Sequence, residues 1–174
     1  MITILLLQTS TFKETRFLIK ILIMNKTTSF AQMYLRLALG IGFILPVLDR
    51  LGYLGAPGSP NVGWGNWTNF VAYTQSLVPY LSLQLANFSG LVATILEVVF
   101  GILLIVGYKT KLAAFGSSLL TLVFALSMLF FAGYRAPFNY SVFVVSASSL
   151  LLACFNEYKW SIDAGLKRIN KRSM

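Results

Sequence analysis

Glu97 is the residue in this chain whose placement most needs a chemical explanation, because it lies inside the apolar run ILEVVFGILLIVGYKTK at residues 95–111. A charge at the centre of a membrane span costs about 2.5–3.5 kcal/mol to insert. The surrounding Leu, Ile, Val and Phe residues offset that cost at about 0.3–0.6 kcal/mol each. The helix can therefore enter a bilayer, and the carboxylate needs a partner there. A carboxylate at such a depth is a candidate site for a proton or a ligand.

Arg36 is the partner that the sequence favours. It lies a short way into the preceding apolar stretch and shares a helical face with Gly40 and Phe43. An ion pair between Arg36 and Glu97 inside the bundle is therefore expected. The pair would either form a proton or ligand site or fix the packing of two helices, and the sequence leaves both interpretations open.

Three other charged residues are candidates for a site at the outer mouth of the bundle: Asp49, Arg50 and Arg135. Each also fits the role of an interface anchor. Trp64 is expected in the aromatic belt at the membrane surface. The chain has no His and a single Cys, which removes the usual protein ligands of haem and zinc and the CxxC redox pair. No metal site and no cofactor held through His or Cys is expected, and any other cofactor is left unassigned.

The elements that position these residues are predicted to be membrane helices. Of the 174 residues, 57% are hydrophobic and 11% are charged, against about 25% charged in soluble domains. Four stretches are apolar enough to span a bilayer, at residues 30–48, 85–107, 112–132 and 138–155. Each carries a stripe of small or polar residues, through which membrane helices pack closely. The expected fold is all-α, an integral membrane four-helix bundle.

The first outer loop and the chain ends complete the expected organisation. Residues 67–78 place apolar side chains on one helical face and predict an amphipathic helix in the outer interface, with a plain connecting loop as the alternative. Residues 1–29 are expected to form an N-terminal cytoplasmic segment. Within it, Met24 is the expected start of translation, and the alternative is that residues 1–23 form an amphipathic cytoplasmic segment. Residues 30–155 form the membrane domain. Residues 156–174 form a basic cytoplasmic tail, with Ile162, Leu166 and Ile169 at helical spacing.

The distribution of cations predicts the orientation. If the N-terminus is inside, the inner side holds eight Lys and Arg residues beyond residue 23, and the outer side holds Arg50 and Arg135. The bias favours a multi-pass protein with both termini in the cytoplasm. The net charge of +9 lies in tails and short loops. Anionic lipid headgroups, rather than nucleic acid, are therefore the expected partner.

Two segments resemble the DoxX family of bacterial four-helix membrane proteins. They are LRLALGIGFILPVLDRLGYLG (35–55) and ILEVVFGILLIVGYKTKLAAFG (95–116). The resemblance covers about residues 31–155. The positions that match the family pattern are Arg36, Gly40, Glu97, Gly101, Gly107, Lys111 and Ala114.

The resemblance implies an inner-membrane protein that is an accessory or quinone-facing subunit of a redox complex. Some relatives are subunits of thiosulfate:quinone oxidoreductase or accompany a terminal quinol oxidase. Quinone is then the expected small molecule, and other redox subunits are the expected partners. A small-molecule transporter or carrier, and a membrane scaffold without a site of its own, remain alternatives. Enzymatic activity and oligomeric state are left open.

Overall fold

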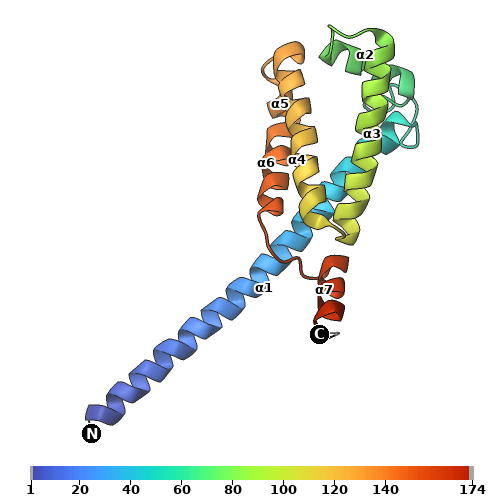
Figure 1. Cartoon of the computed structure of the whole chain (residues 1–174). Coiled ribbons are helices and arrows are strands. Elements are labelled where there is room, and N and C mark those ends of the chain that lie inside the picture. The colour runs from blue at the N-terminus through green and yellow to red at the C-terminus, as the bar shows by residue number, and fades with distance from the viewer. Residues whose placement is uncertain (1, 173–174) are drawn as a thin grey trace.

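The protein is all-helical throughout the part of the chain that the structure describes. This computed structural model describes the backbone of residues 2–172 and the side chains of residues 26–170. The helices are α1 (Ile2–Arg50), α2 (Trp67–Leu77), α3 (Leu83–Val106), α4 (Thr110–Ser127), the π-helix η1 (Met128–Ala132), α5 (Ala136–Asn139), α6 (Val142–Ala153) and α7 (Ile162–Arg172). Figure 1 shows α2 at one end of the bundle and α7 at the other. We call these the α2 end and the α7 end.

Among the residues that the structure describes, three helices are long and apolar enough to cross a membrane: Lys26–Arg50 within α1, α3, and Thr110–Ala132 across α4 and η1. They correspond to the first three predicted spans. The fourth differs, because the chain turns at Ser141, whose φ is +53°. The apolar stretch is divided into the single turn of α5 and the 12 residues of α6. At 1.5 Å per residue, α6 is about 18 Å long, against about 30 Å for the hydrocarbon core of a bilayer.

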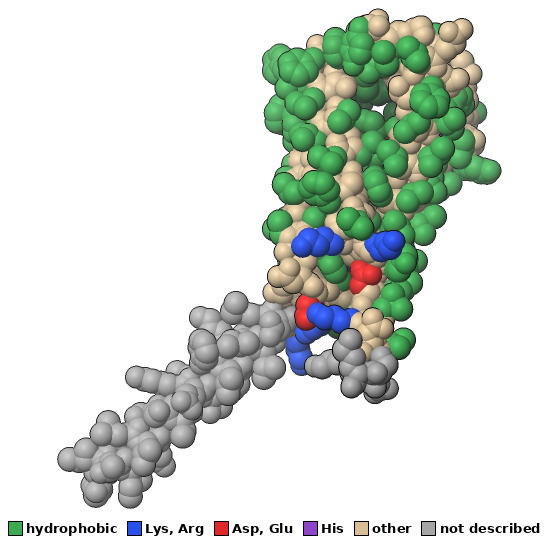
Figure 2. Space-filling view, in the orientation of Figure 1, with side chains coloured by type: hydrophobic (Ala, Val, Ile, Leu, Met, Phe, Trp, Pro, Cys, Tyr) green, Lys and Arg blue, Asp and Glu red, His purple; other side chains and the backbone are tan. Residues whose placement is uncertain are grey.

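The bundle is built from two closely packed pairs, α1 with α3 and α4 with α6. Gly40 and Gly101 allow α1 and α3 to approach, since a Cβ atom on Gly40 would lie 2.8 Å from the carbonyl oxygen of Gly101. Figure 1 shows α3 and α4 close together at the α7 end and farther apart toward the α2 end. The surface is hollowed between them there (Figure 2).

The predicted small-residue stripes face the interior. On α3, Gly90, Ala93, Thr94, Glu97 and Gly101 are buried. On α4, Ala114, Ser117, Ser118, Thr121 and Ala125 are buried. On α6, Ser146, Ser149 and Ala153 are buried. The hydroxyl of Ser146 donates to the carbonyl of Ser118 at 2.9 Å, which joins α6 to α4.

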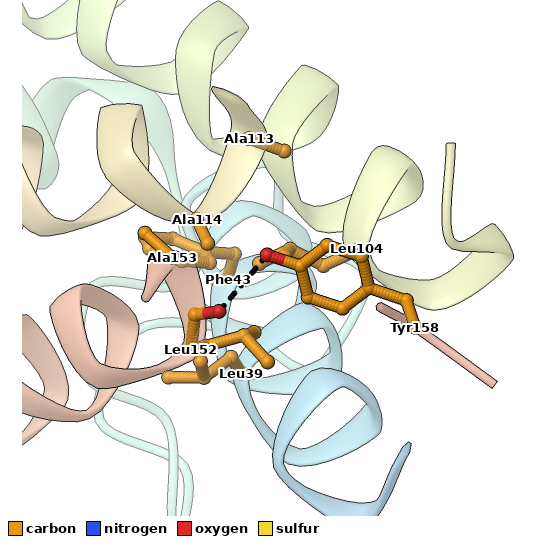
Figure 3. Close-up of a cluster of buried hydrophobic side chains, with 8 residues drawn as sticks. All are labelled: Leu39, Phe43, Leu104, Ala113, Ala114, Leu152, Ala153 and Tyr158. Atoms are coloured by element: carbon orange, nitrogen blue, oxygen red, sulfur yellow. Dashed lines mark hydrogen bonds between the residues drawn. The ribbon is translucent and has the colours of Figure 1, made fainter. Parts of the chain in front are cut away.

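The apolar core lies toward the α7 end. Its buried side chains are Leu39, Phe43, Leu104, Ala113, Ala114, Leu152, Ala153 and Tyr158. Figure 3 shows them converging from α1, α3, α4, α6 and the segment after α6. The hydroxyl of Tyr158 donates to the carbonyl of Leu152 at 3.0 Å. Residues just beyond the last apolar helix are therefore packed into the bundle.

The outer surface is that of a membrane protein. Large apolar side chains are exposed on every long helix, among them Ile41, Ile95, Val99, Leu119 and Val144. Figure 2 shows this apolar surface along the bundle, with the charged side chains of the same face confined to the α7 end. Such a division is typical of a protein whose sides contact lipid and whose end contacts headgroups and water.

Helix α2 begins and ends where the sequence predicts. The side chain of Asn66 accepts a hydrogen bond from the N–H of Asn69 at 2.8 Å and caps the helix. The helix ends at Leu77, before Pro79. Phe70 and Val71 are buried, and Phe70 lies against Gly90 of α3. The apolar face of α2 therefore packs on the bundle, and its location in the membrane interface stays a prediction.

Candidate functional site at the α2 end

Arg50 is the centre of the site. It is the last residue of α1 and is only 2% exposed. Its Nε donates to the carbonyl oxygen of Pro46, one helical turn earlier, at 3.1 Å. This bond directs the guanidinium back along the helix and toward α3. A residue at the end of a span, where interface anchors are common, is thus turned into the protein.

Glu97 and Thr94 of α3 meet the guanidinium. The Nη1 atom of Arg50 lies 2.8 Å from the Oε2 atom of Glu97 and donates to Thr94 Oγ1 at 2.8 Å. Glu97 is 4% exposed. The hydroxyl of Thr94 donates in turn to the carbonyl of Gly90 at 2.7 Å. The charge on each partner is therefore compensated inside the bundle, where an unpaired ion would be costly.

Aromatic rings face the same guanidinium. Its Cζ atom lies 4.0 Å from the ring centroid of Phe70 and 5.3 Å from that of Trp64. Both distances are within the range of cation–π attraction. The two rings also meet edge to face, with centroids 5.3 Å apart. Helix α2 and the loop before it thus place an aromatic cover over the ion pair.

Asp49 holds that cover in place. Its carboxylate accepts hydrogen bonds from the backbone N–H groups of Gly63 (2.9 Å), Trp64 (3.2 Å) and Gly65 (3.1 Å). The loop can approach so closely because a Cβ atom on Gly63 would lie 2.9 Å from Asp49 Oδ2. Gly65 has φ +67°, a conformation that favours glycine. Asp49 therefore positions the ring of Trp64, which lies over the guanidinium of Arg50.

The predicted ion pair between Arg36 and Glu97 is wrong. Close contact between Gly40 and Gly101 sets the register of the antiparallel helices α1 and α3. Side chains lean toward the N-terminus of their own helix. Glu97 therefore leans toward the α2 end, where Arg50 lies, and Arg36 leans toward the α7 end. Arg36 donates there to the carbonyl of Trp160 and lies beside Gly107.

The outer-mouth candidates separate into two groups. Asp49 and Arg50 are buried and form the site with Glu97. Arg135 is exposed, and its guanidinium lies 5.8 Å from the ring centroid of the neighbouring Tyr134. Sequence reasoning missed the roles of Trp64, Phe70 and Thr94. Trp64 was expected to be a belt residue and instead lies over Arg50.

The segment that contains these residues is recognised by a family model. A model described as DoxX matches residues 31–133, which include both Asp49–Arg50 and Glu97. The chain belongs to the DoxX family. The match ends before α5, so that α6 and α7 lie outside it, whereas the sequence resemblance was expected to reach residue 155. Comparison with curated proteins and with solved structures gave no match.

The arrangement gives this DoxX family member a buried carboxylate, Glu97, in direct contact with the Arg50 guanidinium. Arg50 keeps its proton at any physiological pH, whereas a carboxylate such as Glu97 can take one up. Proton uptake by Glu97 would break the ion pair and free a guanidinium to donate to another acceptor. The site can thus couple a proton to the binding of a molecule with acceptor oxygens. No cluster of His, Cys, Asp and Glu suited to a metal occurs among the residues described.

Proposed function

We propose that this DoxX family protein is a multi-pass subunit of the bacterial inner membrane that presents the Arg50–Glu97 site to a quinone in a redox system. The observation that supports the proposal is a buried ion pair under aromatic rings, inside a bundle with an apolar outer surface. A quinone has a flat ring that stacks on aromatic side chains and carbonyl oxygens that accept hydrogen bonds. Its isoprenoid tail belongs in lipid.

The residues of the site have separate tasks in this proposal. The guanidinium of Arg50 donates to one quinone carbonyl, and Phe70 and Trp64 face the ring. Reduction of a quinone to a quinol takes two electrons and two protons. Glu97 takes up one of the protons from water and passes it to the carbonyl oxygen, which returns Glu97 to the carboxylate form that pairs with Arg50. The second proton also comes from water.

The electrons come from a partner redox subunit in this proposal. The chain has no His and one Cys, so that it offers neither the usual haem ligands nor a thiol pair. The orientation we propose has both termini in the cytoplasm. It is supported by the cations that flank the α7 end, which include Lys109, Lys111 and Lys159.

Quinone binding can be tested through tryptophan fluorescence, because Trp64 is part of the site. Purified protein in lipid nanodiscs is titrated with ubiquinone-1 in a Trp160→Phe background, which removes a tryptophan at the α7 end. We expect saturable quenching. Glu97→Gln, which frees the Arg50 guanidinium as proton uptake by Glu97 would, should strengthen the apparent affinity about tenfold, equal to 1.4 kcal/mol. The matched control is Glu157→Gln, at an exposed ion pair with Lys167 at the other end, and it should bind as the parent does.

Two outcomes would overturn the proposal. Quenching that rises linearly with quinone, with no saturation, would show partition into lipid and no site. Equal quinone affinity in the parent, Glu97→Gln and Glu157→Gln would show that quinone binding does not depend on the Arg50–Glu97 ion pair. In either case the buried pair has a structural role, and the scaffold interpretation is favoured.

A further inference from the structure

A second buried arginine, Arg36, lies at the α7 end and is incompletely paired. It is 2% exposed. Its Nη2 donates to the carbonyl of Trp160 at 3.0 Å, whereas its Nε and Nη1 are buried and have no hydrogen-bond partner. Buried donors without partners are uncommon and call for an explanation. Arg36 forms no ion pair with the carboxylates that the structure describes.

The guanidinium of Arg36 lies at the turn between α3 and α4. A Cβ atom on Gly107 would lie 2.7 Å from Arg36 Nη1 and 2.5 Å from the Cβ atom of Ser161. Gly107 also has φ +70°. The absence of a side chain at this position therefore leaves room for the guanidinium on one side and for the C-terminal segment on the other.

The N-terminus of α4 begins at the same turn and already holds a carboxylate. The N–H groups of Lys109 and Thr110 donate to Asp163 Oδ1 and Oδ2 at 2.8 and 2.9 Å. A helix N-terminus attracts anions because its N–H groups are free and its dipole is positive there. The hydroxyl of Thr110 is fully buried and has no partner. The carboxylate of Asp163 thus satisfies the backbone donors and leaves Thr110 Oγ1 and two nitrogens of Arg36 unsatisfied.

The segment that carries Asp163 lies across this cluster. We call residues 158–163 the strap. Arg36 and Gln32 hold it through the carbonyls of Trp160 and Lys159, the second at 3.2 Å. The N–H of Asp163 donates to the carbonyl of Gly107 at 3.0 Å. Burial raises the pKa of the Tyr158 hydroxyl, and the carboxylate charge of Asp163 raises it further. The strap therefore lies over the guanidinium of Arg36 and the turn at Gly107.

We propose that Arg36, Thr110 and the N-terminus of α4 form a binding site for a phosphate group of an anionic lipid, and that the Asp163 carboxylate of the strap occupies part of it. Phosphate has more acceptor oxygens than a carboxylate, with a tetrahedral arrangement. It can therefore accept from the N–H groups of α4 and from the unpaired nitrogens of Arg36 at the same time. Charge-assisted bonds of this kind are among the strongest that proteins form.

A lipid phosphate is the source that the surroundings favour. Exposed cations gather at this end, on the α3–α4 turn and on α7: Lys109, Lys111, Lys159, Lys167 and Arg168. Helix α7 exposes Ile162, Leu166 and Ile169 on one face and carries its basic residues on the other. Such a helix lies at a membrane surface. Movement of α7 onto that surface would withdraw Asp163 and admit the headgroup.

The first test removes the competing carboxylate. Full-length protein is purified in detergent, and bound lipid is measured by native mass spectrometry during titration with phosphatidylglycerol and, separately, with phosphatidylcholine. We expect Asp163→Asn to bind phosphatidylglycerol about tenfold more tightly than the parent, which corresponds to 1.4 kcal/mol. Binding of phosphatidylcholine should be weaker and should change little. Affinity for phosphatidylglycerol equal to that of the parent would overturn the proposal.

The second test removes the donors in the Asp163→Asn background. Arg36→Gln should abolish the gain, and Thr110→Val, which keeps the shape of the side chain, should reduce it. Arg168→Gln is the matched control, because it removes an exposed cation from α7 and leaves the cluster intact. Should Arg36→Gln fail to fold, Arg36→Lys keeps the charge and should retain a reduced gain. A gain unchanged by Arg36→Lys and by Thr110→Val would also overturn the proposal.

Inorganic phosphate distinguishes the two sources of the same chemistry. If the site recognises the phosphate group of a lipid, millimolar phosphate should displace phosphatidylglycerol only weakly, because the acyl chains add to lipid affinity. Complete displacement by phosphate at these concentrations, with no preference for the lipid, would assign the site to a free anion and overturn the lipid part of the proposal.

Discussion

Arg50 and Arg36 lie on the same helix and are equally buried, yet their surroundings differ. Arg50 meets a carboxylate, a hydroxyl and two aromatic rings. Arg36 meets one backbone carbonyl and keeps two nitrogens without partners. Burial alone therefore does not tell what a membrane arginine does. The compensating groups separate an arginine that forms part of a paired site from one that retains capacity to bind an anion.

The largest effect should follow from breaking the ion pair. Arg50→Met should lower the free energy of unfolding by about 3–5 kcal/mol, because Glu97 would be left buried and uncompensated. The measurement is unfolding of the purified protein in mixed micelles with increasing sodium dodecyl sulfate. Arg135→Met is the matched control, since it removes an exposed arginine near the same end, and it should unfold as the parent does.

The double variant Arg50→Met with Glu97→Gln tests whether the uncompensated charge of Glu97 causes the loss of stability in Arg50→Met. It removes both ions, so that it should be more stable than Arg50→Met alone. A double variant that is as unstable as the sum of the two single variants would show that the two side chains act independently. The ion pair would then have no coupling energy.

A smaller effect is expected when Arg36 is removed. Arg36→Met should lower the free energy of unfolding by about 1–3 kcal/mol, since it leaves the carbonyl of Trp160 unpaired but no buried counter-charge. The measurement is the same unfolding experiment, with Arg50→Met beside it. A loss as large as that of Arg50→Met would abolish the distinction between the two arginines.

Gly107→Ala should act on the Arg36 region by crowding. The positive φ alone costs a non-glycine residue about 1–2 kcal/mol, and the new Cβ atom would meet both Arg36 and Ser161. We expect lower stability and faster proteolysis of the strap. Gly42→Ala is the control, because a Cβ atom there would meet nothing within 4 Å. Equal stability of the two variants would contradict the close packing at this turn.

The smallest effect concerns the exposed ion pair of Glu157 and Lys167, whose Oε1 and Nζ atoms are 2.8 Å apart. The hydrogen bond from Lys167, and then its charge, lower the pKa of Glu157. A lowered carboxyl pKa means that any stabilisation is present above the unfolded pKa and disappears as the pH falls through the folded value. Because the pair is in solvent, Glu157→Gln should leave unfolding at neutral pH unchanged. A measurable loss of unfolding free energy in Glu157→Gln would indicate that the C-terminal tail contributes to the stability of the bundle.

The membrane helices could be predicted from sequence because apolar length and small-residue stripes are local signals. Helix α2 was also predictable, since its apolar face is a local pattern and Pro79 follows its end. The partner of Glu97 was not predictable in the same way. Counting residues from the end of a span gives the depth of Arg36 in the membrane, but not the direction in which its side chain leans. The N-terminal lean of both side chains was a usable signal, and it favours Arg50.

The aromatic cover had no comparable signal. Its formation depends on a loop that returns to the end of α1, where Asp49 binds the N–H groups of residues 63–65. Contacts between residues so far apart in the chain, made by backbone groups, leave no periodic pattern. The break before α6 was missed as well, although the polar residues Asn139 and Ser141 interrupt the predicted span there.

The shortness of α6 makes bilayer thickness a variable that acts on this protein. A helix of about 18 Å in a hydrocarbon layer of about 30 Å creates a hydrophobic mismatch on one side of the bundle only. Lipid beside the α4–α6 pair must thin, or water must reach toward Ser141, whereas lipid beside α1 and α3 is matched. The protein therefore distorts its membrane asymmetrically, and we expect a more deformable bilayer to lower the cost of this mismatch.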